Sequence, residues 1–533
     1  MRQLVRWYTT GRNLAYGAWR DPRRIRASRA IGDALLPRLA HHGIGARLFR
    51  LVCVLIVLAS ASFAMLFLGD KLDASGMALT RFMATAQAPL ASAGYPDAVR
   101  DQITVLNYDQ EFLGDSAWPL SYQDHADWLL RLARNPLTRP KAILIDITFG
   151  QEREDPSLPA LQEALCTIQN TFRVPVFLAA LTSRETGWLA LRPGLEAVPV
   201  PGKPPCFTLV GVDYLPDAVD RYAWSYPLTR HLDLDSGEWQ AGPPSAPGQP
   251  FHRSAAMAVA QDVAGIALGP ETVPMSLTWG LHSAPQADRP ATLAGCEPGG
   301  FQARMLVPGV IRQNFMEQRP APCPYHRTLS MAQLGGVVED VAPYLKDRYV
   351  LVSANVAGYN DLIDSPVHGP IPGVHLHAMA LDNLLTYGAR YKLDAEWTMP
   401  PSLDLFLPAM FTLAVVLLVR FFAEWRWNIP LYPDGTDDPA LDGVAQRLRH
   451  VLIEAGFWLL RLTVQAILGM LVITLLQTWF RIGMLPVVEL VTMALFAEGI
   501  NYLGRVRWFF FGDLPLRSSH DHQLLQVTPE RTS

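Results

Sequence analysis

The chain has 533 residues, of which 50% are apolar and 18% charged, against roughly 25% charged in a typical soluble protein. Its 45 lysines and arginines nearly balance 49 aspartates and glutamates, so the net charge of −4 gives no support to a nucleic-acid-binding protein. The apolar fraction argues against a disordered chain, and five cysteines are too few for a scaffold built from disulfides.

The amino-terminal segment differs from the rest of the chain in charge. Residues 1–50 hold eleven arginines and two aspartates, a net charge of +9, so the remaining residues carry −13. Arginines interleaved with tryptophan, tyrosine and leucine suit a helix that lies on an anionic membrane leaflet. We therefore predict that residues 1–50 form a cytoplasmic juxtamembrane segment, whose charge is explained by topology without nucleic acid.

A membrane span is predicted directly after this segment. Residues 51–69 contain no charged side chain, and their number is close to the ~20 that a spanning helix needs. A cleaved signal peptide is the competing interpretation, since Ala59-Ser60-Ala61 resembles a cleavage site. The apolar sequence continues beyond this triplet and the arginine-rich leader would be unusually long, so we favour an anchor.

Residues 70–402 form the predicted external domain, in which strands alternate with helices. Buried strands are predicted at 103–107, 142–146, 174–181, 207–212 and 349–353. Helices are predicted at 124–133, 159–171, 254–264 and 374–387. This alternation indicates an α/β domain with a mixed, largely parallel sheet. The proline- and glycine-rich stretches 242–250 and 295–300 are interpreted as surface insertions.

Four cysteines fall in this external domain: Cys166, Cys206, Cys296 and Cys323. In an oxidising compartment they allow three pairings. We favour the pairs that are close in sequence, Cys166 with Cys206 and Cys296 with Cys323. Zinc binding is the alternative, but no CxxC pair or adjacent histidine supports it.

Three aspartates follow predicted strands and are candidate ligand-binding residues. Asp109, Asp146 and Asp361 lie at strand ends or shortly after them. Because ligands of open α/β sheets bind beyond the carboxyl ends of the strands, these carboxylates could hold a cation or a cationic ligand. The alternative is that they cap helices or form turns.

Two histidines are further candidates. His125 and His377 are each followed by alanine near a predicted helix start, where they could bind a ligand or sense pH. The alternative is a histidine that is hydrogen-bonded inside the fold. His375 should point to a different face of its helix from His377, so the two make a poor metal pair. The chain shows no nucleophile elbow, HExxH sequence or phosphate-binding loop, so we expect no enzyme activity, no cofactor and no metal.

Three more spans are predicted after the domain, at 403–422, 462–480 and 482–503. Arginines in the short flanks place both termini, the loop 423–461 and the tail 504–533 in the cytoplasm, and the domain outside. In a bacterium with two membranes, outside means the periplasm. Glu489 lies within the last span, where a carboxylate costs several kcal/mol unless it is paired or protonated. It could serve a proton path or dock another membrane subunit, or simply pair with Arg461 or water.

Three sequence patterns go beyond fold class. The first contains Asp109, Trp118-Pro119, His125-Ala126 and Asp146 followed by Phe149. The second contains Val212-Asp213, Pro216-Asp217 and Val219-Asp220-Arg221. The third contains Asn360-Asp361, Asp364-Ser365-Pro366, Pro372-Gly373-Val374, His377-Ala378 and Leu384-Leu385. Together they resemble the type-two CHASE domain, an extracellular sensor module of bacterial receptors.

The resemblance covers most of residues 100–390 and is poor around 230–325. Ser365 replaces the usual threonine, and Ala218 with Asp220 departs from the usual Asp-x-Asp-Gly-x-x-Arg pattern. Such domains commonly follow one span and precede three, as hydropathy predicts here. The resemblance implies an extracytoplasmic sensor with Trp118 among its site residues.

Receptors of this type usually continue into a kinase, a cyclase or another output module. Here about thirty residues follow the last predicted span, so we expect a separate membrane or cytoplasmic subunit to read out the signal. The alternative is a structural or interaction subunit of an envelope-spanning complex. A transporter is disfavoured because no repeat is evident. The predicted partners are the lipid bilayer and such a protein subunit, and a homo-oligomer is compatible with either function.

Overall fold

The computed structural model describes residues 81, 84–85, 88–150, 153–214, 216–218, 220–233, 236–244, 248–269, 273–284, 296, 323–356, 358, 361–394, 474–475, 477–479, 481 and 483. All of them belong to one compact unit, Leu72–Leu405 with Met470–Val488. The other unit, Met1–Lys71 with Phe406–Gly469 and Glu489–Ser533, lies outside the described residues.

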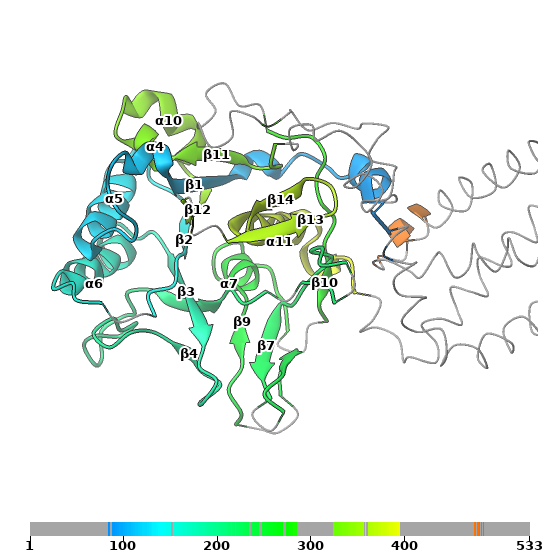
Figure 1. The fold of residues 1–533 in the computed structure, drawn as a ribbon, viewed down its shortest axis with the longest axis horizontal. Helices are drawn as coiled ribbons and strands as arrows, with labels where there is room; N and C mark the ends of the chain where they lie inside the picture. The colour runs from blue at the N-terminus through cyan, green and yellow to red at the C-terminus, as the bar shows by residue number, and fades with distance from the viewer. Residues whose placement is uncertain are drawn as a thin grey trace, which may run out of the picture. The chain divides into compact units, whose positions relative to one another are not determined.

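A seven-stranded sheet forms the centre of the described unit (Figure 1). The strand order is β11-β1-β12-β2-β3-β4, and β5 also pairs with β3. Every pairing is parallel except that of the short β4. The strands are β1 (Ile103–Asp109), β2 (Ala142–Asp146), β3 (Val176–Thr182), β4 (Leu189–Ala190), β5 (Thr208–Gly211), β11 (Arg327–Ser330) and β12 (Tyr349–Asn355). The predicted α/β domain with a largely parallel sheet is therefore confirmed.

Helices cover both faces of the sheet, which explains the nearly continuous apolar runs of its central strands. In Figure 1, α5 and α6 lie on one side of the strands and α7 and α11 on the other. The helices of the α5–α6 side are α4 (Gln110–Leu113), α5 (Tyr122–Arg134), α6 (Leu158–Cys166, continued by the π turn Thr167–Thr171), α9 (Met331–Leu334) and α10 (Val338–Leu345). The opposite side is covered by α7 (Ala255–Asp262) and α11 (Val374–Tyr387).

Strand alternation divides the apolar residues between two cores. Leu106 and Ile145 enter the α5–α6 core, whereas their neighbours Val105 and Leu144 enter the α7–α11 core. The α5 helix starts at Ser121, whose hydroxyl accepts the backbone N–H of Asp124 over 3.1 Å. Its buried residues recur at helical spacing, so one stripe of the helix faces the sheet.

Short strand pairs flank the α7–α11 side. They are β6 (Ser225–Tyr226) with β10 (Met275–Ser276), β7 (Thr229–Leu232) with β8 (Trp239–Ala241) and β9 (His252–Arg253), and β13 (Leu362–Ser365) with β14 (Gly369–Pro372). The 3₁₀ turns η1 (Arg100–Gln102) and η5 (Gly388–Arg390) precede β1 and follow α11. The predicted insertion at 242–250 contributes the connection between β8 and β9, whereas that at 295–300 lies outside the described residues except for Cys296.

The last residues of the domain form a small ladder with a distant segment. The Ser276 N–H donates to the Lys392 carbonyl over 2.8 Å. The backbone of Leu393 forms two hydrogen bonds with residues 481 and 483. Its N–H donates to the Arg481 carbonyl over 2.9 Å, and its carbonyl accepts the Gly483 N–H over 2.8 Å. We call the residues 275–276, 392–394, 481 and 483 the exit ladder. It joins the end of the domain to residues that follow the predicted third span.

The helices and strands predicted for the external domain all have counterparts, and 142–146 and 374–387 have the predicted bounds. The prediction missed β11 with the two short helices after it, the short helix α4, and the short strands β4, β6 to β10, β13 and β14. These strands have two to four residues each and are held by pairing with distant segments, so they lack the apolar runs that identify a strand.

Both predicted disulfides are present. Cys166, at the end of α6, is bonded to Cys206, just before β5, and Cys296 is bonded to Cys323. The thiols are therefore not available for zinc. The loops closed by the two bonds span 40 and 27 residues. Bonds of this kind stabilise a fold by about 2–4 kcal/mol each, mainly by restricting the unfolded chain.

Within the described part of the chain, no helix is long and apolar enough to cross a membrane. The predicted spans 51–69, 403–422, 462–480 and 482–503 lie outside the described residues, apart from a few positions between 474 and 483. The segments 1–50, 423–461 and 504–533, and the intramembrane candidate Glu489, also lie outside them.

Candidate functional site

Polar residues cross the sheet in one register row near the carboxyl ends of four strands. Ser330 of β11 is paired with Asn107 of β1, Asn107 with Ser353 of β12, and Ser353 with Asp146 of β2. The Ser353 hydroxyl donates to the Asn107 amide oxygen over 2.6 Å. Paired residues of parallel strands point to the same face, and here that is the α7–α11 face. The row places Asp146 opposite α11.

Asp146 meets His377 at the end of this row. The Asp146 side chain is 10% exposed, and its Oδ1 lies 4.0 Å from Nε2 of His377. Burial, and secondarily the charge of Asp361, raise the pKa of the Asp146 carboxyl to about 7. Burial lowers the pKa of His377 to about 4, although Asp361 and Asp213 act in the opposite direction. Near neutral pH an uncharged imidazole thus faces a carboxyl that is close to half ionised.

Tyr226 fixes the orientation of His377. The Tyr226 hydroxyl and His377 Nδ1 share a hydrogen bond of 2.8 Å, and both side chains are buried. The same hydroxyl accepts the Ala256 N–H at the start of α7 over 3.3 Å. Burial raises the pKa of Tyr226 far above neutrality, so the phenol stays protonated and can donate to the imidazole. This leaves Nε2 of His377 directed towards Asp146.

Asp361 lies beside Gly373, immediately before α11. The Gly373 N–H donates to the Asp361 carbonyl over 2.7 Å. A Cβ at Gly373 would lie 2.5 Å from Oδ2 of Asp361, so any side chain there would collide with the carboxylate. A side chain at Gly373 would therefore require the Asp361 carboxylate to move away. Asp361 is itself exposed, and its charge acts on both Asp146 and His377.

Asp213 and Arg230 complete the cluster on the β5 side. The buried Arg230 guanidinium donates to the Asp213 carbonyl over 2.5 Å, and the Thr182 hydroxyl donates to Oδ2 of Asp213 over 3.2 Å. Burial raises the pKa of Asp213, while Arg230 opposes this. We call Asp146, Asp213, Tyr226, Arg230, Asp361 and His377 the carboxyl-end cluster. Three carboxyls against one guanidinium favour a cation or a hydrogen-bond donor. However, within the described residues no group of three or more His, Cys, Asp or Glu side chains is arranged to hold a metal ion.

Asp109 has a different position and role. Its Oδ1 accepts the Phe112 N–H at the start of α4 over 3.0 Å and the Ser330 hydroxyl over 2.7 Å. Strand β12 separates β1 from β2, so Asp109 lies two strands away from Asp146. The aspartate is fully buried, and burial raises its pKa. Its contacts are those of a helix cap, which was the alternative interpretation of the strand-end aspartates.

Trp118 and His125 lie together on the other face of the sheet. The His125 ring on α5 packs edge to face against Tyr108, Phe149 and Trp118, with ring centroids 5.1, 5.3 and 5.9 Å away. Burial, and then the charge of Arg153, lower the pKa of His125 to about 4. This surrounding is an aromatic core. The structure therefore brings together Asp146, Asp361 and His377, groups Trp118 with His125 elsewhere, and leaves Asp109 as a cap.

His375 confirms that neighbouring positions of α11 face different surroundings. The charges of His326 and His368 act on His375, whereas Asp361 and Asp213 act on His377. Burial lowers the pKa of His375 to about 3. On the same side, Asp382 accepts hydrogen bonds from Tyr95 over 2.5 Å and forms a buried pair with His326 over 3.0 Å.

Sequence reasoning missed Tyr226, Arg230 and Asp213 as cluster members. A signal existed for Asp213, because it follows a predicted strand just as Asp146 does. No comparable signal exists for Tyr226 and Arg230, since they lie on short strands that the sequence does not predict.

A family model described as the CHASE2 domain matches residues 51–419, which is more than half of the chain. The match includes the first predicted span, the whole α/β domain and most of the second predicted span. No curated protein and no solved structure matches the chain.

Proposed function

The chain belongs to the CHASE2 domain family, and we propose that residues 70–402 are the extracytoplasmic sensor domain of an integral inner-membrane protein that signals through a separate subunit. CHASE2 domains are extracellular sensor domains, which supports a sensor-like role and an external location for this part of the chain. The proposal assigns no catalysis to the domain and no cofactor. The family match is the observation that carries it.

The exit ladder supports the membrane topology. Leu393 ends the domain shortly before the predicted second span, and Arg481 lies between the predicted third and fourth spans. Their backbone hydrogen bonds require both positions to lie on the same side of a membrane. The distribution of arginines independently predicts this arrangement, with both termini in the cytoplasm. We therefore propose four spans with the domain outside, in the periplasm of a two-membrane bacterium.

The carboxyl-end cluster is the proposed ligand site of this sensor. Asp146 offers a carboxyl to a cation or a hydrogen-bond donor, with the Nε2–H group of His377 and the Asp361 carboxylate beside it. Such a ligand would favour the ionised form of Asp146, whose pKa is close to neutral. Binding would thereby shift the domain from one charge state to the other. A sensor requires such a ligand, one that binds two states of the protein with different affinity.

Backbone pairing connects this cluster to the exit ladder. The His377 ring is hydrogen-bonded to Tyr226 of β6, and β6 pairs with β10. Met275 of β10 in turn forms an antiparallel bridge with Leu393 of the exit ladder. Three neighbouring extended segments, β6, β10 and residues 392–394, thus link His377 to Arg481. This is a physical route only, and coupling along it has to be measured.

The alternative function is a structural or interaction subunit of an envelope-spanning complex. Exposed large apolar side chains favour it: Trp188, Val337 and Leu362 are 59%, 61% and 52% exposed. Single exposed apolar residues are common, however, and these three come from separate elements. For this reason we place the sensor function first.

Cysteine labelling in spheroplasts tests the membrane arrangement. An Arg481→Cys variant should react with a membrane-impermeant maleimide added from outside, because residue 481 is proposed to be periplasmic. The four cysteines of the domain are bonded in pairs and should stay silent. Arg447→Cys, in the loop 423–461, is the matched control and should react only after permeabilisation. Labelling of residue 481 only after permeabilisation would contradict the topology.

A further inference from the structure

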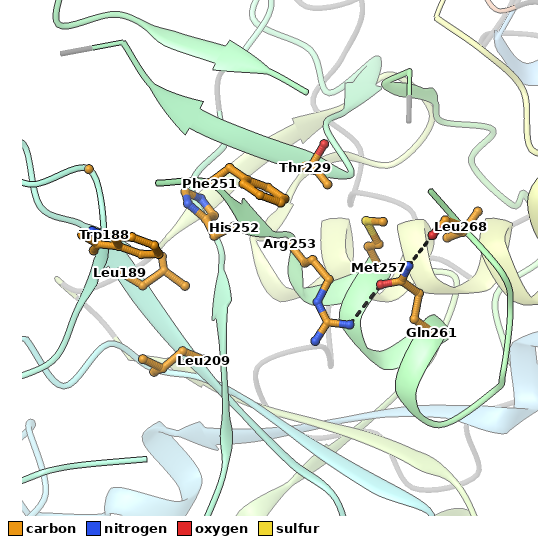
Figure 2. A pocket seen from close by; sticks show the side chains of 11 residues that line it. Trp188, Leu189, Leu209, Thr229, Phe251, His252, Arg253, Met257, Gln261 and Leu268 are labelled. Carbon is orange, nitrogen blue, oxygen red and sulfur yellow. Dashed lines mark hydrogen bonds between the residues drawn. The ribbon is translucent and has the colours of Figure 1, made fainter. Parts of the chain in front are cut away.

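A cavity of about 490 Å³ lies beside the edge strand β5 and is separate from the carboxyl-end cluster (Figure 2). Its walls come from the turn before β4, from β5, β7 and β9, and from α7. The size is in the range of roughly 300–1,000 Å³ found for small-molecule sites. The lining is mostly apolar and includes Trp188, Leu209, Phe251 and Met257.

Two large aromatic side chains at this cavity remain in contact with solvent. Trp188 is 59% exposed and Phe251 is 40% exposed. Figure 2 shows the His252 ring beside Phe251, with Trp188 on the other side of His252 in this view. Rigid aromatic surfaces left open in this way are well suited to contact a flat ring.

His252 is the polar group without a partner in this wall. Its side chain is buried, and neither ring nitrogen has a hydrogen-bond partner among the residues that the structure describes. The nearest carboxylate oxygen, Oδ2 of Asp213, lies 3.9 Å from Nε2. Burial, and then Arg230, lower the pKa of His252 to about 4, so the ring is uncharged at neutral pH. One N–H donor and one acceptor are therefore left unsatisfied, which is unfavourable in a folded protein.

The His252 ring cannot easily turn away to find water. It lies on Gly211, where a Cβ would be 2.3 Å from His252 Cδ2. The Trp239 ring also packs against it edge to face, with the centroids 6.0 Å apart. The absence of a side chain at Gly211 thus creates the space that holds the imidazole in the cavity wall.

Two other polar side chains of the cavity, Arg253 and Gln261, are already hydrogen-bonded. Arg253 donates to both carboxylate oxygens of Asp262 over 2.7 and 2.9 Å, and to Gln261 Oε1 over 3.0 Å. Gln261 donates to the Leu268 carbonyl over 2.6 Å (Figure 2). Since the arginine charge is neutralised by Asp262, the cavity offers no free charge to an ionic ligand.

We propose that this cavity binds an uncharged planar ring compound that carries a hydroxyl or ring N–H group, the class of phenols and indoles. The ring packs against Trp188 and Phe251, and the polar group forms a hydrogen bond with His252. The binding itself does not depend on the sensor function. The interpretation of this binding as a sensed signal rests on that function. His252, next to Asp213, provides the contact between the cavity and the carboxyl-end cluster.

Ligand-observed NMR on the purified full-length protein in detergent tests the ligand class. Phenol is the probe, toluene is the matched compound without a hydroxyl, and benzoate is the matched charged compound. Phenol should bind saturably and compete with indole, and toluene should bind about tenfold more weakly because it leaves His252 unsatisfied. Equal binding of the three compounds, or no saturable binding of phenol, would overturn the proposal.

Two substitutions locate the binding. Trp188→Ala changes an exposed side chain and should weaken phenol binding about tenfold without affecting the fold. His252→Phe keeps a ring on Gly211 but removes both nitrogens, so it should abolish the preference for phenol over toluene. Val337→Ala, at an exposed position outside the cavity, is the control and should bind like the unchanged protein. Unchanged affinity in both cavity variants would place the binding elsewhere. The sensor function is tested separately, by the labelling experiment on membrane topology and by the proteins that co-purify. The results of those two experiments do not depend on ligand binding at this cavity.

Discussion

The two faces of the central sheet are covered by helices of similar length but by different kinds of buried side chain. The α5–α6 core is built almost entirely from aliphatic and aromatic residues, with His125 among the aromatic rings. The α7–α11 side buries a carboxylate, Asp382, and several histidines, among them His326, His368, His375 and His377. Because buried polar groups stabilise a fold only when they are paired, the second face gives up packing energy for a set of titratable groups. Among the described residues, the buried histidines therefore concentrate on the face that carries the carboxyl-end cluster.

The largest effect is expected from breaking the Asp382 pair. Asp382→Ala leaves His326 and the Tyr95 hydroxyl buried without their acceptor and should lower the free energy of unfolding by about 3–5 kcal/mol. Urea unfolding of the purified protein, followed by tryptophan fluorescence, measures this. Asp382→Asn keeps an acceptor oxygen, so its free energy of unfolding should fall by less than that of Asp382→Ala. A loss below about 1 kcal/mol for the alanine variant would show that this face does not depend on its polar pairing.

A core truncation on the other face provides the comparison. Leu161 of α6 is fully buried in the α5–α6 core, so Leu161→Ala should lower the free energy of unfolding by about 2–5 kcal/mol through lost contacts and a cavity. Its effect should not change with pH, because no titratable group is removed. The exposed Leu181→Ala is the control and should stay within about 0.5 kcal/mol of the unchanged protein.

The pH dependence should distinguish Asp146 from the apolar face. Its pKa is raised from 3.8 to about 7 in the folded protein, so the folded state holds the proton more tightly than the unfolded state. The stabilisation is complete below pH 3.8 and is lost as the pH rises to about 7. The free energy of unfolding of the unchanged protein, relative to that of Asp146→Asn, should therefore fall by about 1 kcal/mol per pH unit across this range. Above this range it should not fall further.

The same measurement separates Asp146 from the histidines. Their lowered pKa values make stability rise with pH, the opposite sign, and this contribution cancels in the comparison with Asp146→Asn. A difference between the two proteins that does not vary with pH would mean that folding does not raise the pKa of Asp146, and the proposed charge switch would be wrong.

A smaller effect is expected at Gly373. Gly373→Ala introduces a Cβ that must displace the exposed Asp361 carboxylate and should lower the free energy of unfolding by about 0.5–1 kcal/mol. Gly150→Ala is the matched control, because a Cβ there meets nothing within 4 Å. Thermal unfolding of both variants, side by side, measures the difference. Equal stability would show that Asp361 moves freely and does not define the cluster.

The fold was more predictable than the site. The run at 142–146 is apolar except for its last residue, and 374–387 is flanked by Gly373 and Gly388, so local sequence determines both elements. The Tyr226–His377 contact joins residues 151 positions apart, and Tyr226 lies on a strand of two residues. No local pattern encodes such a contact. Asp109 and Asp146 show the same limit: both end strands, but only the neighbouring elements make one a helix cap and the other part of the cluster.

Affinity purification of a tagged copy from native membranes in mild detergent, with mass spectrometry and a measured particle mass, tests the central proposal most directly. If the chain is a sensor that signals through a separate subunit, a kinase, cyclase or other regulator should co-purify with it in a fixed ratio. Recovery of a large stoichiometric complex of envelope proteins, without a regulator, would contradict the sensor function and make the chain a structural subunit.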